Sequence, residues 1–292
     1  MERIDRQVQL PDGRKLGYSE FGDQNGFPVI NNHGGLLCRL DITPADEPAK
    51  ELGVRIISPD RPGIGLSDPK VGRTLLDWAD DVKLLADQLE LKQFGVIGWS
   101  MGGQYALACA YQLPDRVSAA AVMAGAVPLD SPNSFDELTK LDQRFTRLSQ
   151  RVPKAAEAIF FLMGELAEHA PQTWSTIMSR SIFPIDSEAI RRQPLPGIAG
   201  FAAPALLHAK GMVEEYRAWV RPWGFSFEQI HCPVMVWQGD ADELVPRQWA
   251  EEMARRIPHA RLHLIAGEGH LLPYNHYKDI LTELIQESDK SQ

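Results

Sequence analysis

The chain has 292 residues, 44% of them hydrophobic and 24% charged, a composition typical of a folded globular protein. Its 30 basic and 39 acidic residues give a net charge of −9, which argues against nucleic acid or an anionic membrane as a partner, because both attract clustered basic residues. No run of apolar residues approaches the ~18 that a membrane-spanning helix needs.

The N-terminal region predicts short strands joined by turns. Residues 3–10 and 15–21 flank a Pro-Asp-Gly turn, which indicates a hairpin. Apolar runs over 29–32 and 54–58 predict two further strands, with a helix over 45–52 between them.

Residues 74–89 form the clearest predicted helix. Apolar side chains recur every three or four positions on one face, and Thr74 with Asp77 resembles a capping box. The next elements are an apolar strand, an alanine-rich helix and a second apolar strand, over 94–99, 102–112 and 117–123. Strands without polar alternation are typical of a parallel sheet covered on both faces, so this order predicts an α/β fold.

Residues 129–226 interrupt the alternation of strands and helices. This segment is helical in its periodicity, is broken by prolines and contains no clear strand. It carries 11 basic and 11 acidic residues, so the acidic excess of the chain lies outside it. We predict a helical cap inserted into one core domain, formed by residues 1–128 and 227–292. The second part contains strands over 234–237 and 261–266 and helices over 248–257 and 273–286.

The motif Gly-Trp-Ser-Met-Gly over residues 98–102 lies between a predicted strand and a predicted helix. A serine at such a sharp turn has a strained backbone and an exposed hydroxyl, and side chains at the two glycine positions would clash. The helix that follows offers free N–H groups to a developing oxyanion. Ser100 is therefore the candidate nucleophile.

A serine nucleophile needs a base, and His270 is the best candidate. It lies in a Gly-Glu-Gly-His loop directly after a predicted strand. His276, on the closing helix, ranks second. The other six histidines occupy the predicted cap, strand or loop positions with weaker context, and the His259/His263 pair does not fit a helical metal site because His263 lies in a strand.

Two aspartates in one loop compete to orient this base. Asp240 follows the glycine that ends a strand and more naturally stabilises the turn, whereas Asp242 lies far enough into the loop to turn back toward His270. Asp130, after an earlier strand, is a remote alternative. We predict Asp242 as the acid, which gives the order Ser100, Asp242, His270.

The oxyanion hole requires two N–H donors. The residue after the nucleophile, Met101, provides one, and the His-Gly-Gly loop after the strand at 29–32 is expected to provide the other. We predict the N–H of Gly35, with Leu36 as the alternative, and assign His33 to fixing the loop.

These motifs resemble the α/β-hydrolase superfamily, in the serine branch with a His-Gly loop, Gly-x-Ser-Met-Gly-Gly and a helical cap. Residues 60–67 are similar to the family's D-x-x-G-x-G-x-S turn. The resemblance implies a mostly parallel eight-stranded sheet with helices on both faces, and hydrolysis without a cofactor. The sequence also has no CxxC, HExxH or Walker A motif, so we expect no metal.

The resemblance does not separate several reactions. We favour a serine hydrolase that cleaves a small to medium apolar carboxylic ester or lactone through an acyl-enzyme. The alternatives are a carbon–carbon bond hydrolase of ring-cleavage products, a perhydrolase-like enzyme or a ligand-sensing protein. A carboxylate-bearing ring-cleavage product would need a cation, for which the cap offers Arg192, Arg217 and Arg221.

The predicted cap is rich in aromatic residues, which suggests an apolar pocket although most of them are expected in the cap core. They are Phe160, Phe161, Trp174, Phe183, Phe201, Trp219, Trp223, Phe225 and, at its edge, Phe227. We expect the segment 219–225 to line the pocket entrance.

The remaining expectations concern partners and location. Three widely spaced cysteines do not suggest a disulfide framework, and the N-terminus has no apolar signal segment. We expect a cytoplasmic protein with a small-molecule substrate, no nucleic-acid partner and no membrane span, and a homodimer is left open.

Overall fold

The computed structural model describes residues 4–129, 132–182, 185–192 and 196–290. Eight strands form one sheet in the order β1-β2-β4-β3-β5-β6-β7-β8. The pairs β1/β2 and β2/β4 are antiparallel and the other five are parallel, as expected for the mostly parallel sheet. The strands are β1 (Ile4–Gln9), β2 (Lys15–Gly22), β3 (Phe27–Asn32), β4 (Val54–Pro59), β5 (Phe94–Trp99), β6 (Val117–Met123), β7 (Val234–Gly239) and β8 (Ala260–Ile265).

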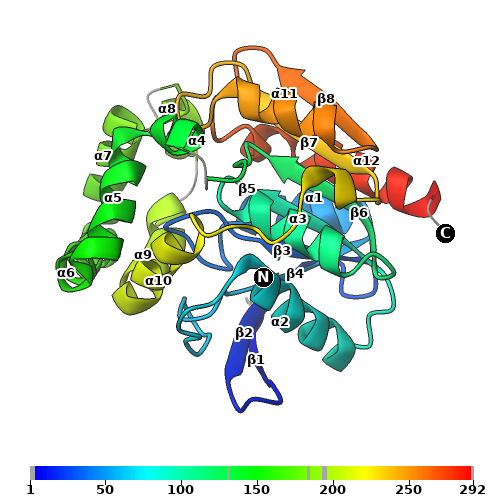
Figure 1. Cartoon of the computed structure of the whole chain (residues 1–292), viewed down its shortest axis with the longest axis horizontal. Coiled ribbons are helices and arrows are strands. Elements are labelled where there is room, and N and C mark those ends of the chain that lie inside the picture. Colours follow the sequence, from blue (N-terminus) through cyan, green and yellow to red (C-terminus); the bar gives the residue numbers. More distant parts are fainter. Residues whose placement is uncertain (1–3, 130–131, 183–184, 193–195, 291–292) are drawn as a thin grey trace.

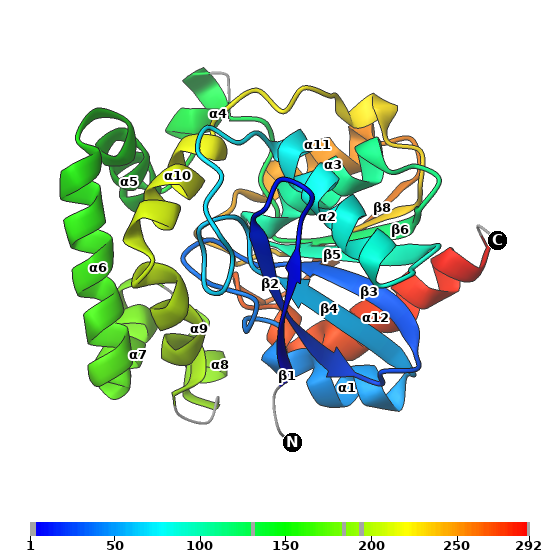
Figure 2. The ribbon, with the colours of Figure 1, turned by 90° about the horizontal axis from the view of Figure 1, so that it is seen from below.

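Helices cover both faces of this sheet (Figure 2). One face carries α1 (Asp46–Glu51) and α12 (Pro273–Lys290), which pack against each other. The opposite face carries α2 (Leu75–Gln88), α3 (Gly102–Gln112) and α11 (Arg247–Arg256). The fold class predicted from the sequence is therefore confirmed.

The predicted capping box at the start of α2 is also present. Thr74 accepts a hydrogen bond from Asp77 N, and the Asp77 side chain accepts one from Thr74 N. The apolar stripe of α2 faces the core, since its buried residues include Leu75, Trp78 and Val82.

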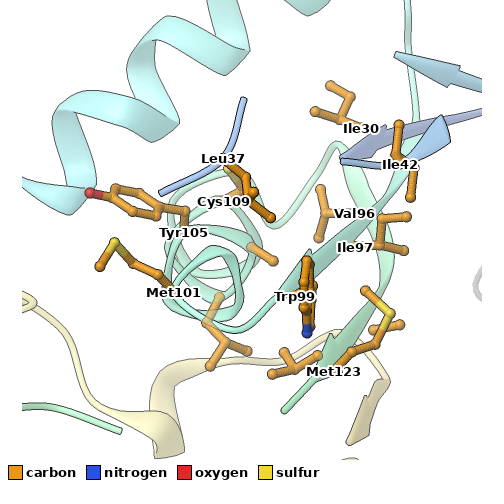
Figure 3. Packing of buried hydrophobic residues seen from close by; sticks show 14 of the residues in the cluster. Ile30, Leu37, Ile42, Val96, Ile97, Trp99, Met101, Tyr105, Cys109 and Met123 are labelled. Carbon is orange, nitrogen blue, oxygen red and sulfur yellow. The ribbon is translucent and has the colours of Figure 1, made fainter. Parts of the chain in front are cut away.

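The helix α3 packs on β5 and β6 in the core. Every residue of β5 and β6 is buried, which explains why neither strand alternates with polar residues. Figure 3 shows this region, with Trp99 at the end of β5 and Met101 and Tyr105 along the chain that enters α3. The strand predicted over 261–266 is β8, a half-buried edge strand, because only β7 pairs with it.

The segment between β6 and β7 is helical and lies to one side of the sheet (Figure 1). Within its described residues it contains no strand. Its helices are α4 (Pro132–Asp136), α5 (Lys140–Arg151), α6 (Pro153–His169), α7 (Pro171–Ile177), the π-helical turn η2 (Met178–Ile182), α8 (Ser187–Arg192), α9 (Gly197–Leu206) and α10 (Ala209–Ala218). The division of the chain into a core of 1–128 and 227–292 and a cap of 129–226 stays a prediction. We refer to 129–226 as the insertion.

Two short 3₁₀ helices complete the structure, η1 (Thr43–Ala45) before α1 and η3 (Phe227–Gln229) before β7. No helix in the described ranges combines the length and apolarity needed to cross a membrane.

Candidate active site

Ser100 lies at the tight turn between β5 and α3. Its φ of 56° is in the left-handed region, which is strained for a residue with a side chain. The turn is held by hydrogen bonds from Ser100 N to Met123 O (2.8 Å) and from Gly103 N to Ser100 O (2.9 Å). This geometry lifts the serine side chain out of the sheet edge and toward the cavity.

The two glycines of the motif are required by close backbone contacts. A Cβ at Gly98 would lie 2.3 Å from Gly102 O, and a Cβ at Gly102 would lie 1.9 Å from Asn32 O. Both distances are far below van der Waals contact, and both contacts are with backbone that cannot turn aside. The turn at Ser100 therefore depends on having no side chain at either position.

His270, which lines the same cavity as Ser100, has its Nδ1 2.9 Å from Asp242 Oδ2. The side chain of Asp242 is fully buried and that of His270 is 4% exposed. Asp242 Oδ1 accepts hydrogen bonds from Leu244 N (2.8 Å) and Val245 N (3.0 Å), while its Oδ2 also accepts one from Gln238 Nε2 (3.1 Å). These bonds fix the carboxylate so that one oxygen faces the imidazole.

The competing residues occupy other positions. Asp240 is exposed and accepts a hydrogen bond from Gly267 N at 2.7 Å, so it stabilises the turn after β8. Asp130 lies outside the described residues. His276, on α12, interacts with Glu268 at 3.4 Å and is not among the cavity-lining residues.

The charges around His270 favour its protonated form. Burial alone would lower the pKa of His270, but the negative charge and hydrogen bond of Asp242, together with the charges of Asp186 and Asp142, outweigh burial and raise the pKa above its usual value of 6.5. Burial would in turn raise the pKa of Asp242, but the charge of His270 and the hydrogen bonds to the carboxylate lower it. The pair is therefore suited to stabilise an imidazolium that forms during a reaction.

The loop after β3 packs directly against the start of α3. A Cβ at Gly35 would lie 3.2 Å from Met101 Cε, and Leu36 has a φ of 61°. Gly34 N donates to Asp41 Oδ2 at 2.8 Å. This close approach brings the backbone of the two predicted oxyanion residues, Gly35 and Met101, to the same wall of the cavity.

Arg61 and His33 hold this loop from behind. Arg61 Nη1 donates to His33 O (2.5 Å), and Arg61 Nη2 donates to Gly34 O (3.2 Å). His33 Nε2 accepts from Arg61 N at 3.1 Å, which leaves its Nδ1–H to donate to Gly34 O at 3.0 Å. Burial keeps the pKa of His33 well below 6.5, so this ring is neutral and structural.

A cavity of about 320 Å³ lies between the sheet edge and the insertion. Ser100, Met101, Gly35 and His270 all line it, and Asp242 lies behind His270. The described structure holds no hydrogen bond between the side chains of Ser100 and His270; such bonds are commonly longer before substrate binds. The sequence-predicted site residues thus meet at one cavity.

The insertion supplies much of the cavity wall, and most of the lining side chains are apolar. From the insertion they are Leu138, Thr139, Leu141, Asp142, Trp174, Met178, Ile198, Ala202, Tyr216 and Trp219. Besides His270, the charged side chains among the described lining residues are Asp142 and Glu243, and no lysine or arginine is present. The described lining of the cavity therefore offers no fixed cation to a negatively charged substrate.

The three arginines predicted as carboxylate ligands have other partners. Arg192 pairs with Glu188 on the exposed side of α8. Arg217 donates to Ser149 O at 2.9 Å and pairs with Glu214, and Arg221 donates to Gly72 O. None of the three lines the cavity.

Of the predicted cap aromatics that the structure describes, Trp174 and Trp219 line the cavity. Trp223 and Phe225 pack on each other, and Phe225 also stacks on Tyr111 of α3. The segment 219–225 thus contributes one aromatic residue to the cavity rather than its whole length, and Phe183 lies outside the described residues.

Three residues that support His270 or Asp242 were missed by the sequence analysis. Trp99 Nε1 donates to His270 O at 2.9 Å, Gln238 supports Asp242, and Asp186 of the insertion accepts hydrogen bonds from His270 N and Leu271 N. Trp99 and Gln238 lie at the ends of buried strands next to predicted site residues, which was an available signal. Asp186 had no such signal.

No group of three His, Cys, Asp or Glu residues that could hold a metal ion occurs in the part of the chain that the structure describes. The three cysteines are free, with Cys38 and Cys109 buried and Cys232 half-buried.

Comparison with known proteins gives a consistent picture. The model of a family described as alpha/beta hydrolase fold matches residues 28–277. A 2-hydroxy-6-oxononadienedioate/2-hydroxy-6-oxononatrienedioate hydrolase from Paraburkholderia xenovorans is 26% identical over 280 residues, which cover 92% of this chain and 89% of that protein.

Two further proteins are similar to the chain. A non-heme chloroperoxidase from Streptomyces lividans is 37% identical over 123 residues, and this match spans only 41% of the chain and 44% of the relative. The structure of a thermophilic esterase from Thermogutta terrifontis, with malate bound, superposes with a TM-score of 0.63 at 26% identity and covers 99% of both chains.

Proposed function

The chain belongs to the alpha/beta hydrolase fold family and is a hydrolase, and from this premise we propose that it is a serine esterase acting on a small to medium, uncharged carboxylic ester or lactone. One observation carries the proposal: a strained serine and a buried histidine–aspartate pair face one largely apolar cavity. A similarity to a solved esterase over nearly the whole chain supports it further.

In the proposed mechanism, Ser100 Oγ attacks the ester carbonyl carbon while His270 Nε2 takes its proton. Asp242, held through both oxygens, keeps the proton of the imidazole on Nδ1 and stabilises the imidazolium. The N–H groups of Met101 and Gly35 stabilise the negative charge on the carbonyl oxygen.

Collapse of the tetrahedral intermediate expels the alcohol, which takes the proton from His270, and leaves an acyl-enzyme on Ser100. Water then attacks this acyl group with His270 again acting as the base. The carboxylic acid leaves, and both Ser100 and His270 return to their starting states.

The charge of the cavity argues for an uncharged substrate. Asp142 and Glu243 are the carboxylates among its described lining residues, with no lysine or arginine beside them. Burial raises the pKa of Asp142, although hydrogen bonds from Thr139 and Tyr216 oppose this shift. A carboxyl side chain, whether neutral or ionised, supplies no positive charge for a substrate carboxylate.

A carbon–carbon bond hydrolase is the second candidate. The similarity over 92% of the chain to a hydrolase of 2-hydroxy-6-oxononadienedioate favours it. The substrate named for that relative carries two carboxylates, however, and the cavity-lining residues that the structure describes include no matching cation. We therefore rank ester cleavage first.

The proposed function is tested by comparing substrates that differ in charge. We expect turnover of p-nitrophenyl esters of short and medium acyl chains or of simple lactones, and little turnover of a dienoate ring-cleavage product. A fluorophosphonate should label the protein but not the Ser100→Ala variant. Absence of both ester or lactone turnover and labelling would contradict the proposal, and preferential cleavage of the dienoate would favour the second candidate.

The raised pKa of His270 predicts the pH dependence. His270 must be neutral to accept the serine proton, so kcat/KM should fall as the pH drops through the pKa of His270. Because the surrounding carboxylates raise this pKa, the midpoint of the acid limb should lie above about 6.5. Ester hydrolysis measured between pH 5 and 9 checks this, and a midpoint below about 6 would contradict it.

A further inference from the structure

A carboxylate of the insertion binds the backbone of the loop that carries His270. Asp186, directly before α8, is 5% exposed. Its Oδ2 accepts a hydrogen bond from His270 N at 2.9 Å, and its Oδ1 accepts one from Leu271 N at 3.1 Å. One side chain thus satisfies two consecutive buried N–H groups, which would otherwise lose their hydrogen bonds at a substantial cost.

The loop is shaped to receive this carboxylate. A Cβ at Gly269 would lie 2.5 Å from Asp186 Oδ1 and 2.4 Å from Ile185 Cγ2. Any side chain at position 269 would therefore push Asp186 away from the His270 N–H. The glycine before the candidate base is explained by this contact with the insertion.

Different residues hold the ring, the carbonyl oxygen and the N–H group of His270. Asp242 binds Nδ1 of the ring, and Trp99 Nε1 donates to the carbonyl oxygen of His270 at 2.9 Å. Both of these residues belong to the ends of core strands or the loops that follow them, whereas Asp186 belongs to the insertion. The N–H side of His270 is therefore positioned by a different part of the chain from its ring and its carbonyl.

We propose that Asp186 is a positioning residue which makes the placement of the base depend on the insertion, so that the insertion forms part of the catalytic apparatus as well as the cavity wall. This inference rests on the proposed function, since it assigns His270 the role of base. Asp186 itself does not touch the cavity-lining nucleophile and acts through His270.

Charge provides a readout that a purely structural residue would not give. Among the described residues, the carboxylates of Asp242, Asp186 and Asp142 act on His270 electrostatically, and each raises the pKa of His270. Removing the charge of Asp186 while keeping its shape should therefore lower the pKa of His270. Loss of one acceptor should also loosen the loop, and a misplaced base lowers kcat more than it changes KM.

The experiment compares Asp186→Asn with the parent enzyme on a small p-nitrophenyl ester. We expect kcat to fall about tenfold, KM to change by less than about twofold, and the acid limb of kcat/KM to move to lower pH. The matched control is Glu188→Gln, which makes the same carboxylate-to-amide change two positions away on the exposed surface of α8. It should leave kcat, KM and the pH profile unchanged.

A second variant separates position from charge and guards against a misfolded Asp186→Asn protein. Asp186→Glu keeps the charge but moves the carboxylate, so kcat should fall while the acid limb stays near that of the parent. Thermal unfolding of each variant shows whether it is folded.

The proposal is overturned if the folded Asp186→Asn or Asp186→Glu protein melts at a lower temperature than the parent but has the same kcat as the Glu188→Gln control. NMR titration of the His270 ring in the parent and Asp186→Asn proteins measures the expected fall in pKa without turnover. Lack of esterase activity in the parent would thus contradict the proposed function alone, while an unchanged His270 pKa would contradict this inference.

Discussion

Replacing Asp242 with asparagine is expected to lower kcat by about 10³ to 10⁴ while leaving the fold intact. The NH₂ group of the asparagine would then face His270 Nδ1 and donate a hydrogen bond to it. The imidazole proton would therefore lie on Nε2, which is the wrong tautomer, and the imidazolium would lose its counter-charge. The Oδ1 contacts to Leu244 N and Val245 N can be kept by the amide oxygen, which preserves the loop. Steady-state kinetics on a p-nitrophenyl ester measures the effect.

Asp240→Asn is the matched control for this prediction, because the two aspartates lie in one loop. Asp240 accepts the Gly267 N–H on the surface, and its substitution should cost about 1 kcal/mol of stability or less with little change in kcat. If Asp240→Asn abolishes activity while Asp242→Asn keeps more than about a tenth of it, the assignment of the acid is wrong.

Replacing Glu215 with glutamine is expected to lower the free energy of unfolding by about 3–5 kcal/mol. Glu215 of α10 is fully buried between two arginines of the core: Arg61 Nε donates to Oε1 at 2.9 Å, and Arg73 pairs with Oε2. The glutamine would leave two buried guanidinium groups without a counter-charge. The melting temperature should fall by roughly 10 °C, measured by circular dichroism.

The pH dependence of stability tests the same ion pair. Burial would raise the pKa of Glu215, but the charges of Arg61 and Arg73 outweigh burial and lower the pKa to about 2. A lowered pKa in the folded state means that the ionised carboxylate stabilises the protein above pH 4.5, and that this stabilisation is lost as the pH falls from about 4.5 to about 2. The stability difference between parent and Glu215→Gln should therefore shrink over that range.

The neighbouring residue provides the control for Glu215. Glu214 pairs with Arg217 near the surface and also accepts the Gly72 N–H, so Glu214→Gln should cost about 1 kcal/mol or less. Equal loss of stability in the two variants would contradict a special role for the buried pair. Arg61 also donates hydrogen bonds to the carbonyl oxygens of His33 and Gly34. Through Arg61, Glu215 of the insertion is therefore connected to the predicted oxyanion loop.

Much of the fold could be predicted from the sequence because the signals are local. Each of these signals depends on residues that are close in the chain. Examples are the apolar stripe of α2 with its Thr74 cap, the apolar runs of β5 and β6, and the Gly-x-Ser-x-Gly turn. The edge position of β8 comes from the structure, because apolar residues alone do not tell whether a strand has one neighbour or two.

By itself the sequence determined the types of element, the strand–turn–helix setting of Ser100 and the loops in which His270 and the two competing aspartates lie. The position of the two aspartates in this loop also led to the prediction of Asp242 over Asp240. The tertiary structure places Asp242 Oδ2 2.9 Å from His270 Nδ1, while Asp240 accepts the Gly267 N–H. It also decided that the described lining of the cavity holds carboxylates and no arginine, and that Asp186 binds a backbone N–H 84 positions away. Such contacts depend on how distant segments pack, and hydrogen bonds between them leave no periodic pattern in the chain.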